Sequence, residues 1–255
     1  MKSDTSKCSF KAIHKEQVQE ALSYLHSFIQ EERALTYQRF FKTSKGEYGY
    51  GDKFLGITVP NTRKAVARYY QTLSLAEISS IIKSQFHEER LFALLVLVAK
   101  YEQKQSNHHN KSEVFTFYKK HMSFVNNWDL VDASAPKIVG DFLYDIENDT
   151  SILRKWATSK NLWTRRIAIV TTLHAIKKKS YFEDTLAIAT ILLKDKHDLI
   201  HKATGWMIRE VGKKDLSVLY SFLDRYHKIM PRTMLRYAIE KLDDDLRLKY
   251  MKKHY

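Results

Sequence analysis

A weak internal repeat of about 36 residues most limits what this chain can fold into. Large apolar residues occupy similar places in successive segments, at intervals of 37, 35, 36 and 36 residues: Leu91, Trp128, Trp163, Leu199 and Leu235. A period of this length is typical of stacked helical hairpins, because each pair of helices buries its apolar face only against its neighbours. The repeat therefore predicts an all-α fold, a right-handed solenoid of antiparallel helical hairpins.

Composition and periodicity favour helix over nearly the whole chain. Only 3 prolines and 7 glycines occur among the 255 residues, and apolar residues recur at three- and four-residue spacing. Helices are expected at residues 16–30 and 33–41, from Pro60, from the capping box Ser74 to Glu77, and at residues 87–103, 152–158, 162–178, 181–193, 199–211, 216–226 and 231–242. Because the signature residues of tetratricopeptide repeats are missing, irregular HEAT-like repeats fit better. We expect one HEAT-like repeat domain at residues 13–255, after a loosely ordered N-terminus at residues 1–12.

The chain carries a large positive charge, which restricts its partners. Its 43 Lys and Arg against 29 Asp and Glu leave a formal net charge of +14, and this indicates a polyanion, with nucleic acid as the first candidate. The longest apolar run, Leu91 to Ala99, is far shorter than the roughly 20 residues that cross a bilayer. A single cysteine, Cys8, excludes an internal disulfide. These features predict a cytoplasmic protein that binds nucleic acid and no membrane.

A glycine-rich stretch from Lys45 to Asp52 interrupts the helices and predicts a loop. Its glycine spacing fits neither common phosphate-binding motif, and no strand precedes it. It presents Tyr48 and Tyr50 beside lysines, which suits contact with a sugar-phosphate backbone. A surface turn with exposed tyrosines explains the same pattern equally well.

A second polar interruption, from Ser106 to Ser112, also predicts a loop. Its adjacent residues His108 and His109 suggest a metal site at first sight. They lack a third ligand at useful spacing, so we expect no metal there.

The stretch from Asn126 to Pro136 combines an aromatic residue with an acid. In a helix, Trp128 and Asp132 stand four residues apart and share a face. Pro136 has no N–H to donate to the carbonyl of Asp132, so the helix should bend or end there. The simpler interpretation is an exposed Asp132 on an ordinary helix, with Trp128 filling the core.

The repeat places charged residues in register with Asp132. At intervals of 34, 36 and 34 residues the chain has Asp132, Arg166, Lys202 and Arg236, which should form one row along a concave basic face. Trp163 lies next to Arg166, and Trp206 lies between Lys202 and Arg209. Arg166 shares its helix face with apolar residues. Burying a cation there is energetically unfavourable unless that face lines a groove that holds an anion. The alternatives are that Arg166 snorkels or pairs with a buried carboxylate such as Asp132.

A basic groove with flat aromatic residues suits phosphates and bases, but a carboxylate in it repels phosphate and should meet something positive. An N-alkylated purine carries a formal positive charge, and its glycosidic bond breaks through an oxocarbenium-like sugar, which glycosidase carboxylates stabilise. Asp132 would offset that charge or orient a water, while Trp128 and Trp206 would pack on the cationic nucleotide. Arg166 would hold a neighbouring phosphate.

Four motifs in order resemble the DNA alkylation repair family of HEAT-like-repeat DNA glycosylases, over residues 30 to 242. They are the stretch Gly46 to Ile57 (GEYGYGDKFLGI), Trp128 to Asp132 (WDLVD), Asn161 to Arg166 (NLWTRR) and Lys202 to Glu210 (KATGWMIRE). The resemblance implies excision of 3-methyladenine and 7-methylguanine from double-stranded DNA, with no metal and no organic cofactor. A monomer is expected.

The resemblance also implies roles for individual residues. Asp132 would be the catalytic carboxylate, Trp128 and Trp206 the aromatic contacts with the lesion, and Arg166 a DNA contact near the site. Further DNA contacts are expected from Arg165, Lys202, Arg209 and Arg236. The aromatic residue at the amino-terminal end of the groove would be Tyr48 or Tyr50.

Two other functions stay open on the sequence alone. A non-catalytic HEAT-repeat protein that binds branched or damaged DNA would have the same charge and fold, although Asp132 favours an enzyme. A protein-binding scaffold is less compatible with the charge of +14.

Overall fold

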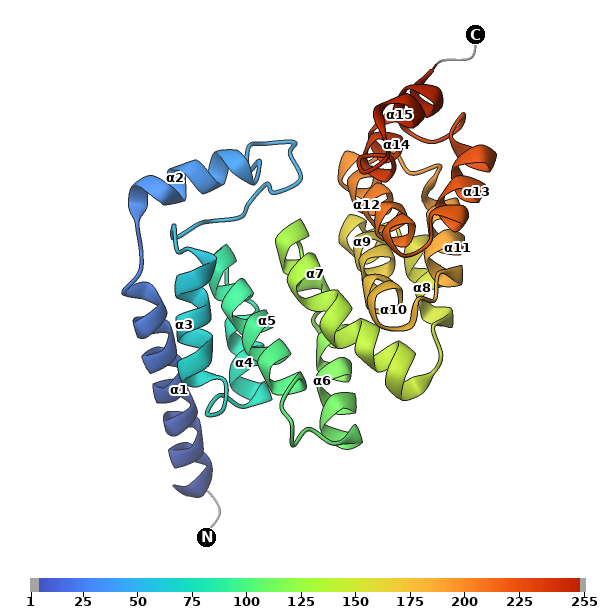
Figure 1. The fold of residues 1–255 in the computed structure, drawn as a ribbon. Helices are drawn as coiled ribbons and strands as arrows, with labels where there is room; N and C mark the ends of the chain where they lie inside the picture. Colours follow the sequence, from blue (N-terminus) through green and yellow to red (C-terminus); the bar gives the residue numbers. More distant parts are fainter. Residues whose placement is uncertain (1–4, 253–255) are drawn as a thin grey trace. The chain divides into compact units, whose positions relative to one another are not determined.

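The computed structural model describes the backbone of residues 5–252, with the side chains of residues 15–178 and 180–252. In this range the chain is helical and has no strand (Figure 1); one isolated bridge pairs Lys53 with Phe86. The chain divides into two compact units, Met1–Ser134 and Ala135–Tyr255. The all-α prediction is therefore confirmed, whereas the solenoid and its concave basic face stay predictions.

The first unit contains the helices predicted from the amino-terminal half of the sequence and two further helices, at residues 108–120 and 122–124, which were not predicted. They are α1 (Thr5–His26), α2 (Glu31–Phe40), α3 (Val59–Tyr69), α4 (Leu75–Ile81), α5 (His87–Tyr101), α6 (His108–Lys120), the short η1 (Met122–Phe124) and nearly all of α7 (Trp128–Ala135). The backbone of residues 5–12, expected to be loosely ordered, is part of α1, and residues 1–4 lie outside the described range.

Local capping explains where several of these helices begin. The side chain of Thr58 accepts the N–H of Asn61, and Pro60 lies in the first turn of α3. Ser74 and Glu77 form the predicted capping box at the start of α4. The apolar run from Leu91 to Ala99 lies in α5, which is buried along nearly its whole length.

The predicted loop from Ser106 to Ser112 is wrong, because α6 already begins at His108. The side chain of Asn107 accepts the N–H of Asn110, and the side chain of Asn110 accepts the N–H of Asn107 in return. This reciprocal pair satisfies two free donors of the first turn, so a run of polar residues starts a helix.

The second unit continues with shorter helices. They are η2 (Pro136–Gly140), η3 (Phe142–Glu147), α8 (Ser151–Ala157), α9 (Leu162–Thr171), α10 (Leu173–Lys179), α11 (Glu183–Leu192), α12 (Asp198–Lys214), α13 (Leu216–Tyr226), α14 (Arg232–Ala238) and α15 (Asp244–Met251). The helix predicted at residues 162–178 is two helices, because the hydroxyl of Thr172 donates to the carbonyl of Ile169 at 2.8 Å and interrupts the backbone pattern. The sequence did not predict α15.

Pro136 acts on the backbone as its chemistry predicts. The α-helical pattern of α7 ends at Ala135, immediately before the residue that lacks an N–H. The chain then continues in the wider π-helical turns of η2 and η3, which end at Asn148 with a φ of 53°. Such π turns absorb the missing hydrogen bond without leaving the helical path.

Helix α12 is central to the packing of the second unit, where it contacts α9, α11, α13 and α14. A Cβ at Gly205 of α12 would lie 2.3 Å from the carbonyl oxygen of Met234 of α14. Only glycine permits so close an approach of the two helices. Helix α12 contacts both α9, which precedes it in the repeat, and α14, which follows it.

Candidate functional site

Trp128 opens α7 and lies at the end of a stack of aromatic rings. Its backbone N–H donates to the side-chain oxygen of Asn127 at 2.8 Å, which fixes the start of the helix. Its ring centroid lies 5.4 Å from that of Phe41, with 21° between the planes, and Phe41 stacks in turn on Phe54 at 4.9 Å and 17°. Because Trp128 is only half-buried, it is an anchored aromatic residue that is still partly exposed.

Phe40 extends this aromatic group to the surface. It is the last residue of α2 and is 61% exposed, and its ring meets Trp128 edge-on, with centroids 6.0 Å apart and 69° between the planes. A large exposed apolar ring beside another aromatic residue suits contact with a base. The sequence patterns do not predict Phe40; its only signal is a pair of phenylalanines just before the glycine-rich loop.

Asp132 lies one turn after Trp128 on α7 and is half-buried. Burial raises the pKa of the phenol of Tyr118 on α6, and the negative charge of Asp132 raises it further. The Tyr118 hydroxyl shares a 3.1 Å hydrogen bond with Ser134. The carboxylate and Trp128 are thus both partly exposed residues of a single helix in the first unit.

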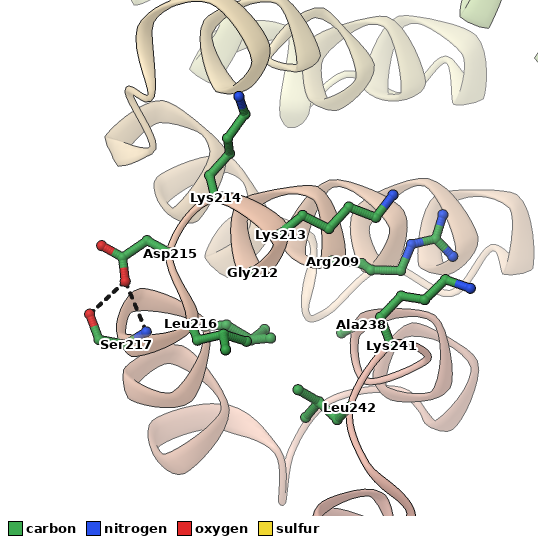
Figure 2. Close-up of a pocket in the computed structure, with 11 residues that line it drawn as sticks. Arg209, Gly212, Lys213, Lys214, Asp215, Leu216, Ser217, Ala238, Lys241 and Leu242 are labelled. Atoms are coloured by element: carbon green, nitrogen blue, oxygen red, sulfur yellow. Dashed lines mark hydrogen bonds between the residues drawn. The ribbon is translucent and has the colours of Figure 1, made fainter.

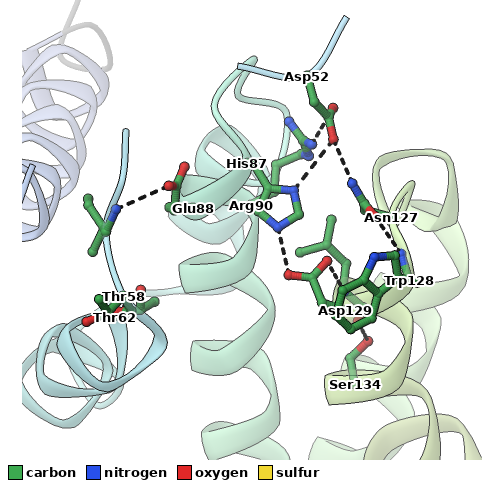
Figure 3. A network of polar contacts seen from close by, with 12 residues as sticks. Asp52, Thr58, Thr62, His87, Glu88, Arg90, Asn127, Trp128, Asp129 and Ser134 are labelled. Atoms are coloured by element: carbon green, nitrogen blue, oxygen red, sulfur yellow. Dashed lines mark hydrogen bonds and ion pairs between the residues drawn. The ribbon is translucent and has the colours of Figure 1, made fainter. Parts of the chain in front are cut away.

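A buried polar network, here called the His87 network, holds the first turn of α7 (Figure 3). His87 Nε2 lies 2.8 Å from Asp129 Oδ2, and its Nδ1 lies 3.5 Å from Asp52 Oδ2. Arg90 donates to Asp52 Oδ1 at 2.7 Å, and Asn127 Nδ2 donates to Asp52 Oδ2 at 3.1 Å. Three separate segments, namely α5, the end of the glycine-rich loop and α7, are therefore tied together.

The network changes the protonation of its members. Burial lowers the pKa of His87, but the charge and hydrogen bond of Asp129, with the nearby carboxylate of Asp52, outweigh burial and raise that pKa to about 9. Burial raises the pKa of Asp52, yet the contact with His87 and the charge of Arg90 bring it below its usual value. His87 is consequently a cation at neutral pH.

Glu88, the next residue of α5, fixes the irregular segment that precedes α3. Its buried carboxylate accepts the backbone N–H groups of Leu55, Gly56 and Ile57 at 3.0, 2.8 and 3.2 Å. Glu88 is one of several charged residues at the start of α5. The sequence does not reveal its role, because the backbone groups that it binds lie more than thirty residues away in the chain. A run of charges before an apolar helix normally indicates a solvated turn.

The two tyrosines of the glycine-rich loop differ in exposure. Tyr50 is 67% exposed, whereas Tyr48 is half-buried. A Cβ at Gly49 would lie 2.3 Å from the carbonyl oxygen of Phe41, so the loop backbone packs closely on the end of α2. Both tyrosines remain candidates for DNA contact, and Tyr50 is the more accessible.

In the second unit, Arg166 points inward. It is 5% exposed, and its Nη1 donates to the carbonyl of Leu199 in the first turn of α12 at 2.6 Å. Trp163, one turn before it on α9, is buried as well. Arg165, in contrast, is half-buried and pairs with Asp195 at 2.6 Å. Arg165 is therefore the more accessible of the two arginines.

The other expected DNA contacts of this unit differ in how they are paired. Lys202 lies 2.8 Å from Asp198 on its own helix, and Arg236 is exposed on α14. The indole N–H of Trp206 donates to Glu210 at 3.2 Å. Trp206 was expected beside cations, but its hydrogen-bond partner is an acid.

Arg209 lines a cavity of about 610 Å³ between α12, α13 and the residues after α14 (Figure 2). Its guanidinium pairs with Glu240 and lies 3.6 Å from Glu210. Of the lysines that share the cavity, Lys213 lies 2.7 Å from Glu210 and Lys241 lies 3.3 Å from Glu240. Acids thus already balance much of the positive charge here.

One group of side chains has the geometry of a metal site. Ligand atoms of Asp141, Asp145 and His174 lie within 4.8 Å of one another. The ammonium of Lys178 lies 3.2 Å from Asp141 and 3.8 Å from Asp145, so a cation already faces both carboxylates. The expectation that the protein needs no metal stays a prediction.

The row of Asp132, Arg166, Lys202 and Arg236 draws residues from both units, and it too stays a prediction. Each unit by itself provides one tryptophan that is partly exposed on a helix with a nearby acid. These are Trp128 on α7 and Trp206 on α12.

Comparison with known proteins decides the family. The chain matches the family described as DNA alkylation repair enzyme over residues 21–242. It belongs to the DNA alkylation repair enzyme family. A search of curated proteins gives no match.

Solved structures agree with this membership in fold. The chain is similar to a "Predicted DNA alkylation repair enzyme from Enterococcus faecalis", with a TM-score of 0.67 and 16% identity over 85% of this chain and 97% of that one. It is also similar to AlkD2 from Streptococcus mutans, with a TM-score of 0.53 and 16% identity over 84% and 99% of the two chains. At this identity the likeness concerns the fold alone. Among the described residues of this family member, no helix is both long and apolar enough to span a bilayer.

Proposed function

We propose that this member of the DNA alkylation repair enzyme family is a monofunctional DNA glycosylase. Its substrates would be cationic alkylated purines, such as 3-methyladenine and 7-methylguanine, in double-stranded DNA. The observation that carries the proposal is the pairing on α7 of a half-buried carboxylate, Asp132, with an anchored and partly exposed tryptophan, Trp128.

The chemistry follows from the charge of the substrate. The bond between the sugar C1′ and the purine nitrogen breaks, and its electron pair neutralises the cationic base, so the leaving base needs no proton. Positive charge develops on the sugar, where the carboxylate of Asp132 stabilises it. Water then adds its oxygen to C1′ and releases one proton, which leaves an abasic site and a free base.

The aromatic residues around Trp128 supply the binding side of the mechanism. A cationic purine is attracted to the face of an indole ring, and the stack of Trp128 on Phe41 holds that ring in one orientation. Phe40, exposed at its edge, adds a second surface for the lesion or a neighbouring base. In the second unit, we propose Trp206 as an aromatic contact with the lesion and Arg165 and Arg166 as DNA contacts.

The remaining basic residues would bind the DNA backbone. Lys202 and Arg209 can pair with phosphates once their acidic neighbours are displaced or shared, and Arg236 is exposed on α14. We expect the active species to be a monomer with no cofactor.

A base-release assay tests the proposal. The protein is incubated with duplex DNA that carries a single 7-methylguanine, and free base is separated from DNA with abasic sites. Release by the parent protein, and its loss in Asp132→Asn with DNA binding retained, would support the glycosylase. DNA binding without base release would instead favour a non-catalytic protein that binds branched or damaged DNA.

A further inference from the structure

The net charge of the side chains in the His87 network depends on whether His87 is protonated. Asp52 and Asp129 supply two carboxylates, and Arg90 supplies one permanent cation. His87 is 2% exposed and contacts both carboxylates. When His87 is protonated the four charges cancel, and when it is neutral one negative charge remains unmatched in a buried place, which is costly.

The same residue connects this balance to the proposed lesion site. The imidazole ring of His87 lies 4.7 Å from the ring of Phe54 and 4.9 Å from that of Phe41. Phe41 stacks on Trp128. A second connection runs through Asp52 to Asn127, whose side chain accepts the backbone N–H of Trp128. Both the ring and the backbone of Trp128 thus depend on the group around His87.

We propose that His87, in its protonated form, is a positioning residue for Trp128. Its two ion pairs hold the first turn of α7 and the aromatic stack in the arrangement that presents the indole face to a cationic base. Loss of the proton leaves the ring with a single N–H, so it can donate to only one of the two carboxylates and one buried negative charge is unmatched; the first turn of α7 then shifts with Trp128. The role in lesion binding rests on the function proposed above, whereas the link between His87 and Trp128 does not.

The charged groups that act on His87 come from three segments. Asp129 faces it from α7, Asp52 from the glycine-rich loop, and Arg90 from α5 itself. The carboxylates stabilise the protonated imidazole and Arg90 opposes it, so removing Asp129 should return the titration toward that of an ordinary histidine. The aromatic rings of Phe41 and Phe54 cover the faces of the imidazole.

A second buried histidine supplies a matched control. In the other unit, His174 lies 2.8 Å from Asp145 and is 7% exposed. Its nearest described aromatic neighbour is Tyr144, at 6.3 Å between ring centroids. His174→Gln therefore removes a buried His–Asp pair of the same length without touching Trp128.

The test follows the indole N–H signal of Trp128 by NMR in the full chain, assigned by its disappearance in Trp128→Phe. In the parent protein this signal should move with a midpoint near pH 9, the pKa of His87. Asp129→Asn should lower the midpoint by about one pH unit or more. His87→Gln should abolish the movement, and His174→Gln should leave it unchanged.

Two results would overturn the proposal. One is a Trp128 signal that does not move between pH 7 and 10 in the parent protein. The other is a movement that persists in His87→Gln with the same midpoint. If His87→Gln does not fold, the midpoint in Asp129→Asn decides alone, because that carboxylate is partly exposed and its replacement is milder.

Activity provides a separate readout. Base release by the parent protein and by His174→Gln should fall as the pH rises through 9, while Asp129→Asn should show this fall at lower pH. If no variant releases base but Trp128 still titrates with His87, the proposed function fails and the positioning role stands. If base is released but Trp128 does not titrate, the positioning role alone fails.

Discussion

Helices α7 and α12 carry the same short pattern, a tryptophan followed four residues later by an acid, yet their surroundings differ. On α12, Trp206 donates its indole N–H to Glu210, and Glu210 also lies 2.7 Å from Lys213 and 3.6 Å from Arg209. On α7, Trp128 is stacked on Phe41, and the charge of Asp132 acts on the buried phenol of Tyr118.

This difference separates a structural acid from a candidate catalytic one. The charge of Glu210 is matched by cations of its own helix, so it has little capacity to stabilise a further positive charge. Asp132 is half-buried one turn after the stacked Trp128, and its charge acts on the buried phenol of Tyr118, a position from which a carboxylate can stabilise a cationic substrate. Sequence spacing alone does not distinguish the two acids.

The largest predicted effect is on the rate of base release, and it distinguishes Asp132 from Glu210. Asp132→Asn should lower the rate of base release from 7-methylguanine DNA by about 10²- to 10³-fold, because it removes the charge that stabilises the transition state. Glu210→Gln should lower it only a few-fold. Single-turnover rates of both variants at saturating protein measure the effect, and equal losses in the two would contradict the assignment of Asp132.

The second prediction concerns the pH dependence of stability. The pKa of His87 is raised from 6.5 to about 9 on folding, so its contribution is complete below pH 6.5 and is lost as the pH rises through 9. The free energy of unfolding should therefore fall by on the order of 3 kcal/mol between pH 6.5 and 9.5. In the second unit, the lowered pKa values of Asp198 and Glu240 matter only on acidification.

Urea unfolding at pH 6.5 and 9.5 measures this slope. His87→Gln should be less stable than the parent protein at pH 6.5 and nearly independent of pH in this window. His174→Gln should keep the slope of the parent protein. A parent protein equally stable at both pH values would contradict the shift assigned to His87.

The third prediction compares the tryptophans. Trp128→Ala should weaken binding of DNA that carries 7-methylguanine by about 10-fold relative to undamaged DNA, as expected for loss of one stacking and cation–π contact. Trp206→Ala should weaken it less, because the indole of Trp206 is already tied to Glu210. Competition binding with damaged and undamaged duplexes gives the ratio, and a larger loss in Trp206→Ala would reverse the comparison.

Sequence patterns predict the local features of both regions well and the long-range ones poorly. Helical spacing places Trp128 and Asp132 on one face, and the chemistry of proline predicts the end of α7 at Ala135. The sequence does not predict the His87 network, because Asp129 lies 42 residues after His87 in the chain. The two side chains meet only through the tertiary packing of α5. Nor does spacing reveal that Trp206 would bond Glu210 rather than lie free beside Lys202 and Arg209.

The smallest effect is expected at Phe40, and it tests whether the aromatic surface of the first unit extends beyond Trp128. Because Phe40 is 61% exposed, Phe40→Ala should change the free energy of unfolding by less than about 0.5 kcal/mol. Base release at subsaturating DNA should nevertheless fall several-fold, since the exposed ring would stack on the lesion or its neighbour.

Tyr50→Ala is the matched variant, because Tyr50 is 67% exposed on the glycine-rich loop and has no described ring contact with Trp128. If Phe40 acts through Trp128, its replacement should lower the preference for damaged over undamaged duplex. Tyr50→Ala should lower binding to both duplexes equally, as expected for a backbone contact. If Phe40→Ala, like Tyr50→Ala, lowers binding to damaged and undamaged duplex equally, Phe40 does not contribute to recognition of the lesion. On this surface Trp128 alone would then recognise it.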